Sequence, residues 1–245
     1  MFEEFGMYVL AGLVAQLIDG ALGMAYGVTA TSLLLSVGVP PAVASATVHT
    51  AECVTTGVSA LSHHAFGNVS RELFRRLLLP GVVGAAIGAT LLSMLPGDAI
   101  APWVAGYLVI MGLVIIVKAF RQFPPRDVTT HLAPLGFFGA LVDAIGGGGW
   151  GPIVGSTLIV RGASVRMTIG SVNAVEFFVT LSASVTFFLT LGITHWWIVA
   201  GLALGGAIGA PFGAWACRHV PVKPFMVLVG LLVIGLSLRT LIRLI

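Results

Sequence analysis

Two short polar sequences stand in apolar surroundings and repeat at a fixed interval. The first runs Thr47-Val48-His49-Thr50-Ala51-Glu52, and the second runs Ser171-Val172-Asn173-Ala174-Val175-Glu176, 124 positions later. In each, a glutamate follows the imidazole or the amide by three residues, so both side chains share one helix face. Their hydrogen-bond donors, and an imidazole that titrates near neutral pH, predict a binding site for an oxyanion. We expect this site to include Thr47, His49, Ser171 and Asn173.

A second repeated element combines an aspartate with glycines. Asp19 to Gly27 returns 124 positions later as Asp143 to Gly151, where four glycines stand in a row before Trp150. An unbroken helix disfavours glycine, so we predict a helix break at both places. A break exposes backbone N–H groups that carry partial positive charge, and glycine lets an anion approach them. The predicted cradle consists of Gly23, Gly147 and Gly148, next to Tyr26 and Trp150.

The composition indicates that the helices carrying these residues lie in a membrane. Hydrophobic residues make up 58% of the 245 residues and charged residues 9%, and the mean hydropathy is +1.06. A soluble domain with this composition would have too little polar surface to cover its core. The chain is therefore predicted to be an all-α polytopic membrane protein.

The repeat divides the chain into two homologous halves. We expect a first repeat over residues 1–120, a cytoplasmic linker over 121–133 and a second repeat over 134–245. Residues 6–38 would form a helix of roughly 50 Å, against a hydrocarbon core of about 30 Å, so the glycines must break it or fold it back. Each half is then one glycine-broken or re-entrant element followed by three transmembrane helices.

The basic residues favour inverted repeats. If every segment crosses once, eight Lys and Arg residues lie on one side and four on the other. If the glycine-containing segments are re-entrant, the distribution is ten against two, which fits the excess of basic residues in cytoplasmic loops better. Three crossings in each half then give the two repeats opposite orientations.

Four carboxylates lie inside the predicted spans: Asp19, Glu52, Asp143 and Glu176. A carboxylate in a membrane normally faces a partner, a cavity or a proton pathway. The glutamates would repel a bare dianion, so we interpret them as proton carriers or as structural groups that bind freed backbone amides. The aspartates either cap the broken helices or take part in ion or proton transfer.

Packing is the alternative role for the other candidate residues. Glycines let helices approach closely in lipid, and Tyr26 and Trp150, which occupy equivalent positions, can serve as a gate, a substrate wall or core filler. Cys53 and Cys217 have no metal-ligand spacing and are interpreted as small buried hydrophobic residues.

The paired motifs resemble the TauE/SafE family of sulfite exporters. The resemblance rests on Asp19 to Gly27, His49 to Glu52, the glycine run before Trp150, and Gly170 to Phe177, and it extends from about residue 8 to the C-terminus. It implies a bacterial inner-membrane secondary transporter that exports sulfite or a related small sulfur-containing anion or organosulfonate.

Two other function classes remain open. A passive anion channel would use the same site without coupling to a proton gradient. An intramembrane metal site or enzyme is weaker, because Asn173 replaces His49 in the second copy and no ligand set of metal-site spacing is present. We expect no enzymatic activity, no cofactor, no metal and no nucleic-acid partner; the partners are the anion and the lipid bilayer, and a homodimer is compatible with the sequence.

Overall fold

The protein is a bundle of helices in the computed structural model, which describes residues 2–120, 128–192, 195–217, 219 and 223–244. The elements are α1 (Phe2–Leu22), α2 (Tyr26–Ser36), α3 (Pro41–Ala65), α4 (Arg71–Met94), α5 (Gly97–Ala119), α6 (Leu132–Gly146), η1 (Gly151–Gly155), α7 (Ser156–Val160), α8 (Val165–Thr190), α9 (Trp196–Ala216) and α10 (Lys223–Leu244). Within the described residues, six helices are long and apolar enough to cross a membrane, namely α1, α4, α5, α8, α9 and α10. The predicted class, an all-helical multi-pass membrane protein, is confirmed.

Helix α3 is missing from those six because of its polar residues. It has 25 residues, which corresponds to about 37 Å and is long enough to span the hydrocarbon core. Serine, threonine, histidine and glutamate side chains lower its hydropathy, and most of them are buried. They are shielded because α3 packs against both α8 and α9 in the interior of the bundle.

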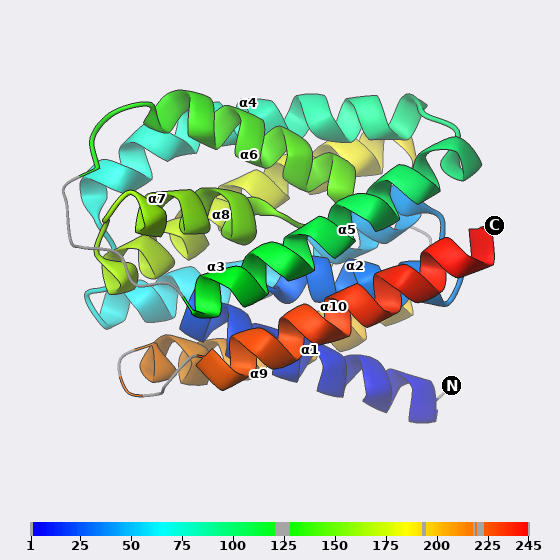
Figure 1. Cartoon of the computed structure of the whole chain (residues 1–245), viewed down its shortest axis with the longest axis horizontal. Helices are drawn as coiled ribbons and strands as arrows, with labels where there is room; N and C mark the ends of the chain where they lie inside the picture. The colour runs from blue at the N-terminus through cyan, green and yellow to red at the C-terminus, as the bar shows by residue number, and fades with distance from the viewer. Residues whose placement is uncertain (1, 121–127, 193–194, 218, 220–222, 245) are drawn as a thin grey trace.

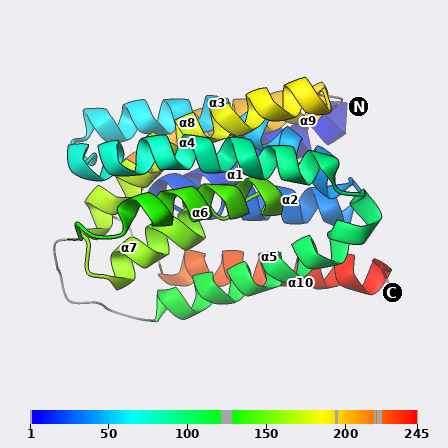
Figure 2. The same cartoon turned by 90° about the horizontal axis from the view of Figure 1, so that it is seen from above.

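Both glycine-containing segments fold back within the bundle. Helix α1 ends before Gly23, which has φ 67°, and α6 ends before Gly147, which has φ 69°. Gly148 and Gly149 follow with φ of 149° and 155°, values that a residue with a Cβ rarely adopts. Figures 1 and 2 show α7 returning toward the end of the bundle where α6 begins, and α2 returning toward the end that holds the N-terminus. Each segment is therefore a helical hairpin whose tip lies inside the protein.

The two halves contribute equivalent packing contacts. Elements 124 positions apart are called counterparts here: α1 and α6, α3 and α8, α4 and α9, α5 and α10. The pair α1–α9 corresponds to α6–α4, and the pair α3–α9 corresponds to α8–α4; all four pairs are in contact. Thr56 and Thr180 are themselves counterparts, and their Oγ1 atoms lie 3.5 Å apart. The halves thus meet where α3 packs against α8.

Glycines set the spacing of the outer helix pairs. A Cβ added at Gly12 of α1 would overlap the Leu202 backbone of α9, and one added at Gly84 of α4 would overlap the Phe137 backbone of α6. Close backbone contact of this kind is a principal source of helix association in lipid.

The helices on either side of the loops begin close to the predicted boundaries. Of the predicted linker over residues 121–133, residues 121–127 lie outside the described part of the chain. Its last two residues belong to α6. Helix α4 begins at Arg71, because Ser70 accepts a hydrogen bond from the Leu73 N–H and so caps the helix.

Candidate functional site

The tips of the two hairpins meet in the interior. A Cβ added at Gly27 would lie 2.8 Å from the Cα of Gly148, and one added at Gly151 would overlap the Gly23 carbonyl. Side chains from other helices bind the second tip: Thr31 Oγ1 donates to the Gly147 carbonyl, and Tyr107 Oη donates to the Gly148 carbonyl at 2.9 Å. The predicted cradle glycines therefore hold the two tips together, which is the packing role weighed for them above.

Each tip is bridged by an aspartate. Asp143 Oδ1 accepts a hydrogen bond from the Trp150 N–H at 2.9 Å, and Asp19 Oδ1 accepts one from the Tyr26 N–H at 3.5 Å. Both bonds span seven residues and join the end of one arm to the start of the next. Both carboxylates are buried, so they satisfy backbone donors that no water reaches.

His49 connects the first half to the second tip. Its Nε2 lies 3.1 Å from Asp143 Oδ2, and its Nδ1 lies 2.8 Å from the Ser45 carbonyl. The carbonyl can only accept, so Nδ1 carries a hydrogen, and the contact between Nε2 and Oδ2 requires one more proton between its two atoms. The pair therefore exists either as imidazolium with carboxylate or as imidazole with carboxylic acid. Ser45 completes the connection by donating from Oγ to the Ala144 carbonyl at 2.7 Å.

Asn173, the counterpart of His49, has different partners. Its Oδ1 accepts from Ser59 Oγ at 2.7 Å, and its Nδ2 donates to the Ile169 carbonyl at 3.1 Å. The second oxygen of Asp19 has no hydrogen-bond partner within the described part of the chain, although it is buried. The two halves thus place the same carboxylate in different environments: Asp143 faces an imidazole and Asp19 does not.

Glu52 and Glu176 join the aspartates in the interior. A Cβ at Gly27 would lie 3.0 Å from Glu52 Oε1, so this carboxylate packs against the first hairpin. Its carboxyl group lies within electrostatic range of His49, Asp143 and Asp19, and that of Glu176 lies within range of Asp19, Glu52 and Asp143. Both glutamates are buried, and Glu176 Oε2 has no hydrogen-bond partner among the described residues. Four carboxylates and one imidazole therefore share a single buried region.

Thr47 and Ser171 lie apart from the His49–Asp143 contact. Their hydroxyls donate to their own helices, Thr47 to the Val43 carbonyl at 2.7 Å and Ser171 to the Met167 carbonyl at 2.6 Å. Ser171 also accepts from the Ser70 N–H at 2.8 Å, which fixes the loop before α4. Residues two positions apart do not share a helix face, so Thr47 and Ser171 point away from the face of His49 and Asn173.

The two large aromatic side chains beside the tips fill the interior. Tyr26 and Trp150 are both buried. Tyr26 Oη donates to the Leu202 carbonyl at 3.0 Å, and Trp150 Nε1 donates to the Val172 carbonyl at 3.1 Å. Each ring therefore anchors its hairpin to a neighbouring helix through one hydrogen bond.

A stripe of polar residues on α3 contains members that the motifs did not include. Ser45, His49, Glu52, Thr56, Ser59 and His63 follow one another at steps of three or four residues, the spacing of one helix face. All six are buried. Ser45 and Ser59 bind the two halves of the site, and this periodicity was the signal that could have identified them.

One family model and two known proteins match the chain. Residues 8–240 match the family model described as sulfite exporter TauE/SafE. The chain is 43% identical over 247 residues to the "Probable membrane transporter protein YtnM" of Bacillus subtilis (strain 168), covering 97% of this chain and 82% of that protein. It is 27% identical over 257 residues to the "Probable membrane transporter protein ORF9" of Sinorhizobium sp, covering 98% of this chain and 93% of that protein. No solved structure matches the chain.

The His49–Asp143 pair makes a first testable prediction. His49→Ala or Asp143→Ala alone should destabilise the protein by about 3–5 kcal/mol, because each leaves a buried polar group without its partner. The double variant should lose less than the sum of the two single losses. Denaturation of the purified protein in detergent measures all four members of this cycle. Additive losses would mean that the two side chains do not interact.

Proposed function

Since the chain belongs to the sulfite exporter TauE/SafE family, a family of membrane transporters, we propose that it is a secondary carrier for sulfite or a related small sulfur-containing anion. Transport would be outward across the bacterial inner membrane and coupled to protons. The observation that carries this proposal is the meeting of two hairpin tips beside His49 and four buried carboxylates.

An inverted arrangement of the halves is part of the proposal. Figure 1 shows α5 and α10 side by side, with their chains running in opposite directions, and α3 and α8 are opposed in the same way. Counterparts that run in opposite directions are what inverted repeats require. Carriers of this design hold their substrate near the middle of the membrane, where the repeats meet, and expose it alternately to the two sides.

The distribution of basic residues supports one orientation. Nine Lys and Arg residues lie in the described part of the chain, and seven of them gather at the end where α3 and α5 finish. These are Arg71, Arg75, Arg76, Lys118, Arg161, Arg166 and Lys223. Only Arg239 and Arg243 lie at the other end, and Arg243 donates to the Ser36 carbonyl there. We assign the first end to the cytoplasm.

The contacts of His49 suggest how an anion and a proton are linked. Asp143 occupies two donors that an oxyanion would use, the Trp150 N–H and the His49 ring. A proton on Asp143 removes the charge that holds it beside an imidazolium. An anion can then replace the carboxylate at His49 without placing two negative charges together. Asn173 lies apart from this exchange, because its partner Ser59 is ten residues along α3 from His49, which is about 15 Å of helix.

The remaining carboxylates supply further proton acceptors. Glu52 and Glu176 interact electrostatically with both aspartates, and four ionised carboxylates in one buried region would repel each other strongly. We assign Glu52 and Glu176 to proton transfer between this region and the two faces of the membrane.

Flux in proteoliposomes tests the proposed function. Purified protein should carry sulfite faster than sulfate, thiosulfate, sulfoacetate and chloride, and an imposed proton gradient should drive sulfite to accumulate against its concentration gradient. Sulfite flux that only dissipates its own gradient would identify a passive channel. Transport of another sulfur anion in preference to sulfite would support the carrier function and identify that anion as the substrate.

Substitution of the glutamates tests the proton assignment. Glu52→Gln and Glu176→Gln keep the size of each side chain and remove the titrating group. We expect wild-type sulfite flux to increase as the pH falls, because the carboxylates must be protonated, and we expect each variant to have a flatter profile. Matching profiles in the wild type and both variants would exclude these residues as proton carriers.

A further inference from the structure

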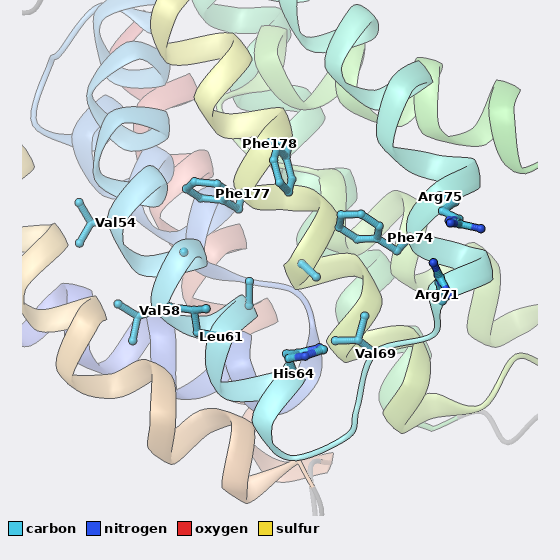
Figure 3. A pocket seen from close by; sticks show the side chains of 13 residues that line it. Val54, Val58, Leu61, His64, Val69, Arg71, Phe74, Arg75, Phe177 and Phe178 are labelled. Atoms are coloured by element: carbon cyan, nitrogen blue, oxygen red, sulfur yellow. The ribbon is translucent and has the colours of Figure 1, made fainter.

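A cavity of about 840 Å³ opens on the side of the bundle between α3 and α4, away from the hairpin tips. Helices α3 and α4 hardly touch, while each of them packs against α8, which forms the floor between them. Figure 3 shows the side chains that line this space. We call it the lateral groove; its apolar lining includes Val54, Gly57, Leu61, Phe74, Phe177 and Phe178.

The lateral groove is open toward the bilayer. Leu61 is 73% exposed and Val54 is 47% exposed, and side chains of this kind face lipid in a membrane bundle. Gly57 creates part of the depth, because a Cβ at this position would lie 3.3 Å from the Phe177 ring. On the floor and far wall, Phe74 and Phe178 pack edge to face with ring centroids 5.8 Å apart. The lateral groove therefore has the volume and the apolar lining to take a hydrocarbon chain.

Two arginines stand at the mouth of the groove. Arg71 and Arg75 lie one turn apart on the first turns of α4 and line the cavity together with His64. No carboxylate in the described part of the chain pairs with either arginine. Their neighbour Arg76 differs, since it binds Glu72 at 3.0 Å and the Thr129 carbonyl at 2.6 Å. The charge at the mouth is thus available to a ligand.

The equivalent place in the second half lacks these features. Leu181 replaces Gly57, and His195 and Val199 replace Arg71 and Arg75. A leucine there removes the depth that glycine provides, and the paired positive charge is absent. Because the repeat does not require the groove, its presence at the basic end of the bundle needs its own explanation.

We propose that the lateral groove binds an anionic phospholipid. The phosphate of the headgroup accepts hydrogen bonds from Arg71 and Arg75, whose planar guanidinium groups suit phosphate oxygens, and an acyl chain lies along the groove against Leu61 and the phenylalanines. Basic residues beside a membrane helix attract anionic lipids, and here they stand directly above an apolar channel.

Native mass spectrometry of the purified full-length protein tests the proposal. Phosphatidylglycerol should bind in preference to phosphatidylcholine with the same acyl chains. The double substitution Arg71→Gln and Arg75→Gln should weaken phosphatidylglycerol binding at least about tenfold. Arg76→Gln removes a charge of the same sign from the same helix, but it lies outside the groove and should leave binding unchanged.

Two further variants address the groove itself. Gly57→Leu installs the residue of the second half and should reduce the binding of phosphatidylglycerol in protein that remains monodisperse. Leu61→Cys is made in a chain whose two native cysteines are replaced by serine. If a second copy of the protein occupies the lateral groove, this cysteine should form disulfide-linked dimers in membranes. Equal binding by the wild type and the Arg71→Gln/Arg75→Gln variant, or efficient cross-linking at Leu61→Cys, would overturn the proposal.

Discussion

A chain that reverses direction inside a membrane leaves backbone N–H groups at its turn, and each of them needs an acceptor because no water is present. Here the acceptors come from within the hairpins. Asp19 and Asp143 each reach seven residues forward to the N–H that starts the second arm. The constraint explains why an aspartate precedes each tip, and it places two carboxyl groups in the interior before any substrate is considered.

The rest of the bundle follows from enclosing those tips. Glycines at both tips allow one hairpin to lie against the other, and Tyr26 and Trp150 attach them to neighbouring helices. Helices α3 and α8 pack together beside the tips and bring Thr56 to its counterpart Thr180. A polar stripe on α3 can exist in the membrane because the surrounding helices keep it away from lipid.

The two halves share a framework but differ in chemistry. Asp143 faces His49, whereas the counterpart amide of Asn173 is bound to Ser59 and to its own helix. One half therefore holds a pair that shares a proton, and the other holds a carboxylate with an unpaired buried oxygen. This difference is the reason that we propose the exchange of a proton and an anion at the His49–Asp143 pair and not at Asp19.

Sequence patterns predicted the features that depend on local chemistry. Composition identified a membrane protein, and the 124-residue repeat identified the broken helices and the helix faces of His49 and Asn173. These patterns do not predict contacts between segments that are distant in the sequence. No residue beside Thr31 or Tyr107 in the sequence indicates that their side chains bind the second tip. Thr47 and Ser171 were assigned to the site as hydrogen-bond donors, and in the structure their hydroxyls donate to their own helices.

Sulfite binding to purified protein over a pH series, measured by calorimetry, tests the central claim most directly. The account predicts that wild-type affinity rises as the pH falls, that Asp143→Asn binds sulfite with a weaker dependence on pH, and that His49→Ala binds it poorly throughout. Equal affinities and equal pH dependence in all three proteins would show that the anion does not compete with Asp143 for His49.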